Sequence, residues 1–213
     1  RAPTHEHSVP SSRPPMEPSS HTTSIAAHRT SQKIYAAGWS LGGTAALFNA
    51  WSPLQEALNL PNASFAGYLM WYPGCLALPD LNEWDKDFMQ IYIGEDDNWT
   101  PPQPCKELVA LMNNQGGNAH IELYPNAFHS FDSPNPLKLW PDAYSWANCK
   151  LKLNGETKKV YDPSNTELDF SDPKARRAAY ESCAVKGEVM AGASPEYQNA
   201  AFEHLATLLP KLD

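Results

Sequence analysis

The feature that most constrains this chain is a serine flanked by glycines in the run GWSLG, residues 38–42, which follows an apolar stretch. Residues 34–37 predict a short buried strand, and a helical pattern follows the motif directly. A G-x-S-x-G run between a strand and a helix holds its serine on a sharp turn with the hydroxyl exposed. Side chains at Gly38 or Gly42 are expected to collide across such a turn. The context therefore favours Ser40 as a nucleophile over an ordinary turn serine.

Apolar runs and helical patterns alternate along the rest of the chain. Further strands are predicted at 67–72, at 88–94, where the strand is expected to be buried, and at 119–125. Helices are predicted at 44–51, at 100–117 with Thr100 as cap and glycines as stop, and at 194–212 with Ser194 as cap and Pro195 in the first turn. Gly43 is expected to let the first helix pack closely on its neighbours. This alternation predicts an α/β fold, a largely parallel sheet with helices on both faces.

The chain divides into a leader, a main domain and an insertion. Residues 1–30 are rich in Pro, Ser, Thr and His, and predict a flexible leader that buries too little surface to order itself. Residues 31–213 form the main domain. Within it, residues 149–190 predict an inserted hairpin with a type I′ turn at Asn154-Gly155, followed by a helix capped by Ser171.

The four cysteines are Cys75, Cys105, Cys149 and Cys183. They form no CxxC pair, and no histidine is spaced beside them as a zinc ligand would be, so no metal is expected. An even count fits two disulfides and also fits buried free thiols. We favour disulfides, hence a secreted or periplasmic protein, with a cytoplasmic one as the alternative. The order along the chain suggests a Cys149–Cys183 bridge that holds the insertion together.

Charge and hydropathy exclude two classes of partner. The formal net charge is −8 and the pI is about 5.3, so the chain would repel a phosphate backbone, and no Lys/Arg stripe opposes this. Nucleic acid is therefore not expected as a partner. No apolar run approaches the roughly 20 residues of a membrane span, so no membrane partner is expected.

A nucleophilic serine needs a base, and the base needs an acid that orients it. In a fold of this type the acid and then the histidine follow later strands. Acidic residues 95–97 come directly after the strand at 88–94, and His129 comes shortly after the next strand. His120 falls within a strand pattern and His204 within the last helix, where structural roles are expected. From the residues alone, Asp96 and Asp97 remain equally good candidates for the acid.

The chain carries four motifs in this order: GWSLGG, YPGC, GEDDNWTPPQPC and YPNAFHSFD. Together they resemble the motifs of the dienelactone hydrolase family of α/β-hydrolases, over about residues 33–131. The resemblance implies Ser40 as nucleophile, His129 as base and Asp97 as acid, the last because the family's acid lies three residues after the strand-ending glycine and four before a proline. The family's namesake enzymes carry cysteine as nucleophile. The serine in this chain therefore favours a serine esterase over a hydrolase of dienelactone itself.

The resemblance implies acyl transfer to Ser40 without a cofactor, from a small-molecule ester. The backbone N–H of Leu41 is expected to bind the oxyanion. Trp39, Trp99 and Tyr72 lie beside the motifs and are candidates for lining a substrate pocket, with core packing as the equal alternative.

The GWSLG motif lies at residues 38–42, whereas the family fold places several strands before this motif. One of the loops among those strands supplies a second N–H donor for the oxyanion. Three explanations follow: a longer protein of which this is a part, a second chain that completes the sheet, or a degenerate scaffold. Two functions are therefore carried forward, a serine hydrolase and a non-catalytic partner subunit with a hydrolase scaffold.

Overall fold

The computed structural model describes residues 33–60, 65–80, 83–157, 159–168 and 172–212, so the predicted leader lies outside the described residues. Its centre is a four-stranded parallel sheet with the order β1-β2-β4-β5. These strands are β1 (Tyr35–Trp39), β2 (Gly67–Trp71), β4 (Phe88–Gly94) and β5 (Asn118–Tyr124). Every residue of β2 and β4 is buried, as expected for central parallel strands that are covered on both faces.

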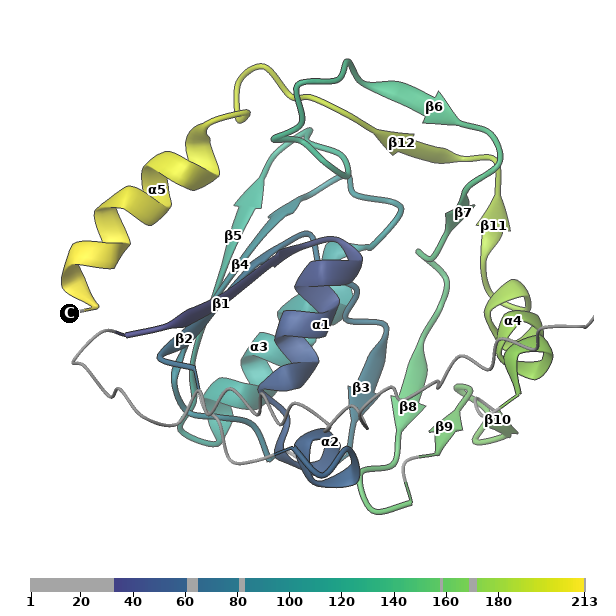
Figure 1. The fold of residues 1–213 in the computed structure, drawn as a ribbon. Helices are drawn as coiled ribbons and strands as arrows, with labels where there is room; N and C mark the ends of the chain where they lie inside the picture. Colours follow the sequence, from purple (N-terminus) through teal and green to yellow (C-terminus); the bar gives the residue numbers. More distant parts are fainter. Residues whose placement is uncertain (1–32, 61–64, 81–82, 158, 169–171, 213) are drawn as a thin grey trace, which may run out of the picture. The chain divides into compact units, whose positions relative to one another are not determined.

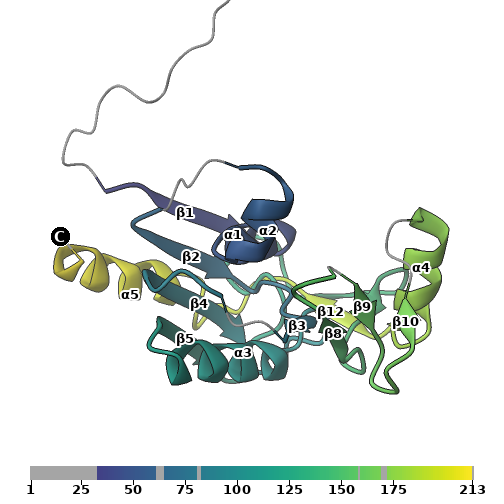
Figure 2. The same ribbon diagram turned by 90° about the horizontal axis from the view of Figure 1, so that it is seen from below.

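Helices cover both faces of this sheet (Figures 1 and 2). One face carries α1 (Leu41–Asn49) and α3 (Pro102–Asn114), and the other carries α5 (Ala200–Leu208). Trp39 and Trp71 are register partners, so they share a face, and Phe202 of α5 packs against both rings. The predicted α/β class, a mostly parallel sheet with flanking helices, is confirmed.

The last two predicted helices differ from the structure at their ends. α5 begins at Ala200, because residues 195–199 form turns, so Ser194 and Pro195 lie before the helix. α3 begins at Pro102 with Pro101 at its cap position, and Thr100 makes other contacts. A short helix that the sequence reading missed, α2 (Ser52–Ala57), follows α1 directly, and a single 3₁₀ turn, η2 (Leu209–Lys211), follows α5.

Beyond β5 the chain forms short strands that pair in small groups at one end of the sheet (Figure 1). We call residues 138–191 the insertion. Its elements are β6 (Lys138–Trp140), β7 (Tyr144–Ser145), β8 (Leu151–Leu153), β9 (Val160–Tyr161), β10 (Glu167–Leu168), α4 (Pro173–Glu181), β11 (Val185–Lys186) and β12 (Val189–Ala191). β6 pairs with β12 and β7 with β11, so the inserted unit begins about ten residues earlier than the predicted 149–190. β8 also pairs with β3 (Ala77–Pro79) from the main domain.

Two local predictions for the insertion were wrong. The hairpin β8–β9 pairs Leu153 with Val160, which leaves more residues between the two strands than the two of a type I′ turn. Asp80 instead accepts hydrogen bonds from the Asn154 side chain and the Gly155 N–H, which stabilises a wider loop. The cap of α4 is Asp172, whose carboxylate accepts from the N–H groups of residues 174 and 175, and the predicted cap Ser171 lies outside the described residues.

The four cysteines form two disulfides, Cys75–Cys105 and Cys149–Cys183. The first links the loop after β2 to α3 and is fully buried. The second closes the insertion, as the chain order suggested. Among the residues that the structure describes, no helix has the length and apolar character to cross a bilayer.

Candidate active site

Ser40 lies at the turn between β1 and α1 with φ 50° and ψ −119°, a strained conformation for a residue with a side chain. Its N–H donates to the Trp71 carbonyl at 2.9 Å, which fixes the turn to the neighbouring strand. A Cβ at Gly38 would lie 2.2 Å from the Gly42 carbonyl oxygen, so only glycine fits there. Local crowding therefore forces the chain to present the Ser40 hydroxyl.

The second crowded position of the turn is Gly43, and the prediction for Gly42 was wrong. A Cβ at Gly43 would lie 3.0 Å from the carbonyl oxygens of Gly38 and Trp71, which agrees with its predicted role in close helix packing. A Cβ at Gly42 would meet no atom of the described residues within 4 Å. The reason is that Gly42 already lies in the first turn of α1 and points away from β1.

The structure brings Ser40, His129 and Asp97 together from three different loops. His129 Nε2 lies 3.0 Å from Ser40 Oγ, and His129 Nδ1 lies 2.8 Å from Asp97 Oδ2. His129 and Asp97 are each only 2% exposed, so the pair is shielded from competing water. These distances match those of a nucleophile, a base and an orienting acid.

The geometry distinguishes Asp97 from Asp96, the two candidates for the acid between which the sequence could not choose. Glu95 and Asp96 are exposed, whereas Asp97 is buried and turned inward. Its Oδ1 accepts the backbone N–H groups of Trp99 at 2.9 Å and Thr100 at 2.8 Å. Both carboxylate oxygens therefore have donors, which holds the group in the orientation that His129 needs.

Thr100 is a site residue that the sequence reading missed, because its position before a helix suggested a cap. Its Oγ1 lies 3.1 Å from Asp97 Oδ2, 3.0 Å from His129 Nδ1 and 3.1 Å from the Tyr72 carbonyl. The hydroxyl thus contacts both partners of the His129–Asp97 pair from within the protein.

Tyr72 packs against His129 and shares a hydrogen-bond acceptor with Trp39. The Tyr72 ring packs edge-on against His129 with centroids 4.6 Å apart, and its hydroxyl donates to Asp132 at 2.7 Å. Asp132 also accepts from Trp39 Nε1 at 2.9 Å. Burial, followed by the Asp132 carboxylate, raises the pKa of Tyr72 well above its usual range. Tyr72 therefore remains a neutral donor, and neither ring lines the cavity next to Ser40.

The other candidate histidines lie away from this cluster. His120 is exposed on β5, where its Nε2 lies 2.8 Å from Asn118 Oδ1. His204 lies on α5 with its ring edge-on to Tyr92. Within the described ranges, no group of three or more His, Cys, Asp or Glu is arranged to hold a metal ion.

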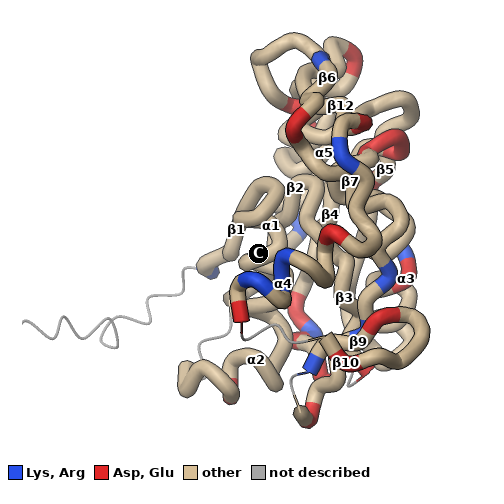
Figure 3. Tube along the Cα trace, turned by 90° about the vertical axis from the view of Figure 1, so that its right-hand side faces the viewer, with Lys and Arg blue, Asp and Glu red and all other residues tan. Residues whose placement is uncertain are grey.

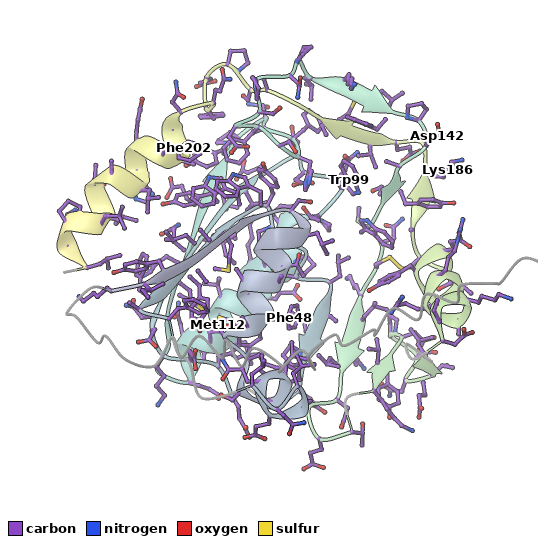
Figure 4. The ribbon with its side chains drawn as sticks, viewed as in Figure 1. Phe48, Trp99, Met112, Asp142, Lys186 and Phe202 are labelled. Carbon is purple, nitrogen blue, oxygen red and sulfur yellow. A yellow bond between two sulfur atoms is a disulfide. The ribbon has the colours of Figure 1, made fainter. Side chains whose placement is uncertain are left out.

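The space in front of Ser40 is a cavity of about 420 Å³. Of the three predicted pocket residues only Trp99 contributes to its lining. Figure 4 shows Trp99 and Phe48 of α1 on the side of the sheet that faces the insertion. The lining is made by Ser40, Leu41, Thr44, Phe48, Gly74, Leu76, Ala77, Trp99, Thr100, Trp146 and Tyr180. Leu41 begins α1, and the N–H groups in the first turn of a helix have no partner within it.

The sheet and the chain order of the site together define the class of fold. A serine at the strand–helix turn is followed by an acid after β4 and a histidine after β5, which is the order of an α/β-hydrolase. The described residues thus form part of an α/β-hydrolase fold.

Comparisons with solved structures find partial matches. The apo form of Thermogutta terrifontis esterase 2 is 17% identical, with 46% of each chain covered and a TM-score of 0.38. The carboxylesterase Cest-2923 from Lactobacillus plantarum WCFS1 is 17% identical, with 46% of each chain covered and a TM-score of 0.37. MGS-M1, an alpha/beta hydrolase enzyme from a Medee basin deep-sea metagenome library, is 16% identical over 46% of this chain and 40% of its own, with a TM-score of 0.36. The matched part spans less than half of each of these proteins. No protein-family model and no curated protein matches the chain.

Proposed function

We propose that this protein is a serine hydrolase that cleaves carboxylic esters through an acyl-enzyme on Ser40. The observation that carries the proposal is the hydrogen-bonded series Ser40 Oγ, His129 Nε2, His129 Nδ1 and Asp97 Oδ2, at 3.0 and 2.8 Å. The proposed family type, that of the dienelactone hydrolases, rests on the four sequence motifs. No cofactor enters the mechanism.

In the first half of the reaction His129 Nε2 accepts the Ser40 proton while Oγ attacks the ester carbonyl. Asp97 keeps the Nδ1 proton on the far side of the ring and stabilises the imidazolium that forms. His129 then donates the proton to the leaving alcohol. In the second half a water molecule gives its proton to His129 and attacks the acyl group, and Ser40 Oγ leaves with the returned proton.

The oxyanion of each tetrahedral intermediate would be bound by the N–H of Leu41 at the start of α1. A fold of this class uses a second donor from a loop among earlier strands. We propose that this donor comes from outside the described residues, in this chain or in another that completes the sheet beside β1. Two disulfides are typical of proteins from oxidising compartments, which supports a secreted or periplasmic location.

The test is turnover of 4-nitrophenyl butyrate by the protein and by three alanine variants. Ser40→Ala and His129→Ala are expected to lower kcat by about 10⁴-fold or more, since members of a triad act as a unit. His120→Ala is the matched control, because His120 is exposed on β5, and its activity should equal that of the parent. Turnover that survives in Ser40→Ala would overturn the proposal. A folded protein without any turnover would favour the non-catalytic partner subunit instead.

A further inference from the structure

Two aromatic side chains of the insertion face Ser40 across the cavity. Phe48, Thr44 and Leu41 form the wall on α1, and Trp146 and Tyr180 form the wall on the insertion. The Trp146 and Tyr180 rings meet edge to face with centroids 4.8 Å apart. Rings held in this way present a rigid apolar surface.

The Cys149–Cys183 disulfide fixes the positions of these two rings. Cys149 follows Trp146 by three residues, and Cys183 follows Tyr180 by three residues. Each cysteine N–H donates to the carbonyl of its aromatic partner, at 2.9 Å for Trp146 and 3.1 Å for Tyr180. The bridge thus joins two turns of backbone that each carry one ring of the wall.

The insertion is also joined to the loops that carry Asp97 and His129. The Asn98 side chain donates to the Glu188 carbonyl at 2.5 Å and accepts from the Met190 N–H at 3.1 Å. The Gly192 N–H, just after β12, donates to the His129 carbonyl at 2.8 Å. These bonds fix the part of the insertion that carries Trp146 and Tyr180 relative to the loops that carry Asp97 and His129.

The cavity lining carries no acidic, basic or imidazole side chain among the described residues. The charged residues of α4, which Figure 3 marks along the trace, are exposed, and Arg177 pairs with Glu181 at 2.7 Å. A neighbouring cavity of about 290 Å³ that also borders Leu76 differs, because Glu107, Lys150 and Lys152 line it. An anionic group bound beside Ser40 would therefore lose water without gaining a partner.

We infer that the insertion is the specificity element of the hydrolase, and that Trp146 and Tyr180 select esters with a neutral, aryl-sized apolar group over small or anionic ones. This inference rests on the proposed function of Ser40. The Cys149–Cys183 bridge is the positioning element, because it acts through the two rings.

Boronic acids test this inference, because each adds to a nucleophilic serine and carries one organic group. The inhibition constants of methylboronic, phenylboronic and 4-carboxyphenylboronic acid are measured against 4-nitrophenyl butyrate. The parent is expected to bind the phenyl compound about 30-fold more tightly than its carboxylated analogue. Trp146→Ala and Tyr180→Ala should each weaken phenylboronic acid about 10-fold and leave methylboronic acid within about 2-fold.

Two further variants sharpen the test. Cys149→Ser/Cys183→Ser should weaken phenylboronic acid as the alanine variants do, while methylboronic acid again reports an intact Ser40 centre. Tyr161→Ala removes an aromatic ring of the insertion that does not line this cavity, and should change none of the three constants. Equal affinity for the phenyl and carboxyphenyl compounds would overturn the inference and leave the proposed function standing. If none of the three inhibits an active enzyme, methylboronic acid included, Ser40 is not the reacting nucleophile, and the proposed function fails together with the inference. If the parent protein itself does not turn over 4-nitrophenyl butyrate, the result counts against the proposed function.

Discussion

The sheet and the insertion build the site in different ways. Ser40, Asp97 and His129 follow parallel strands of five to seven residues, and their positions are set by close packing and backbone hydrogen bonds. Trp146 follows the two-residue strand β7 and Tyr180 lies in the short helix α4, where the Cys149–Cys183 disulfide supplies much of the constraint. Under the proposed function, reactivity and selectivity should therefore be separable in this molecule, because different forces fix the groups proposed to provide each.

The largest expected effect concerns the crowded elbow on the sheet side. Gly38→Ala would place a methyl group 2.2 Å from the Gly42 carbonyl oxygen, and we expect it to lower the free energy of unfolding by about 3 kcal/mol. Gly42→Ala is the matched control. It lies in open space in the first turn of α1 and should be neutral or slightly stabilising. Urea denaturation measures both, and equal losses would show that the packing of the turn is not as described.

The next effect separates the two disulfides. Cys149→Ser/Cys183→Ser should raise the hydrogen-exchange rates of the insertion, with a loss of about 3 kcal/mol for a bridge that spans 34 residues. Protection of β2 and β4 should remain. Cys75→Ser/Cys105→Ser lies in the core and should lower protection throughout the sheet. Uniform loss in both variants would mean that the insertion and the sheet unfold as one unit, contrary to the comparison.

A smaller effect concerns the hydroxyl beside the His129–Asp97 pair. Thr100→Val keeps the shape of the side chain and removes the contacts with Asp97 and His129, so kcat should fall about 10-fold with little change in KM. Thr100→Ser should restore most of the activity. Thr166→Val, an exposed threonine of the insertion, serves as the control and should leave kcat unchanged. A fall in Thr100→Ser as deep as that in Thr100→Val would assign the effect to packing alone.

The smallest effect is a pH dependence on the sheet side. Burial raises the pKa of Asp85, which accepts a hydrogen bond from Tyr68 at 2.5 Å. A carboxyl whose pKa is raised in the folded state stabilises the fold below its unfolded pKa, and this stabilisation is lost as the pH rises through the folded value. Asp85→Asn removes that loss. The melting temperature of the variant, relative to that of the parent, should therefore rise slightly between pH 4 and pH 7. If this difference in melting temperature instead falls as the pH rises from 4 to 7, the pKa of Asp85 is not raised in the folded protein.

The sequence predicts the sheet side well because its signals are local. Residues 67–71 form a continuous apolar run, and 88–94 form one that only Gln90 interrupts. The order of Ser40, Asp97 and His129 along the chain follows from the topology of a parallel sheet. The Cys149–Cys183 pairing followed from chain order, because both cysteines fall within one inserted unit.

The residues that the sequence reading missed depend on contacts that no local pattern encodes. Tyr180 lies 140 positions from Ser40 in the chain, and its partner Trp146 follows a two-residue strand, β7, in a stretch without periodicity. Thr100 carries a cap signature but turns its hydroxyl to Asp97. Asn154-Gly155 carries a turn signature, but hydrogen bonds that these two residues donate to Asp80 select a wider loop. In each case a tertiary contact overrides a local preference.

The most direct test of the central claim is to treat the protein with a fluorophosphonate and to locate the adduct by peptide mass spectrometry, alongside Ser40→Ala and His129→Ala. The account predicts one adduct, on Ser40, because Ser40 Oγ lies 3.0 Å from His129 Nε2, the base that activates it. No adduct is expected in His129→Ala after the same time. A folded protein that stays unlabelled, or that is labelled at another residue while Ser40 remains free, would contradict the account.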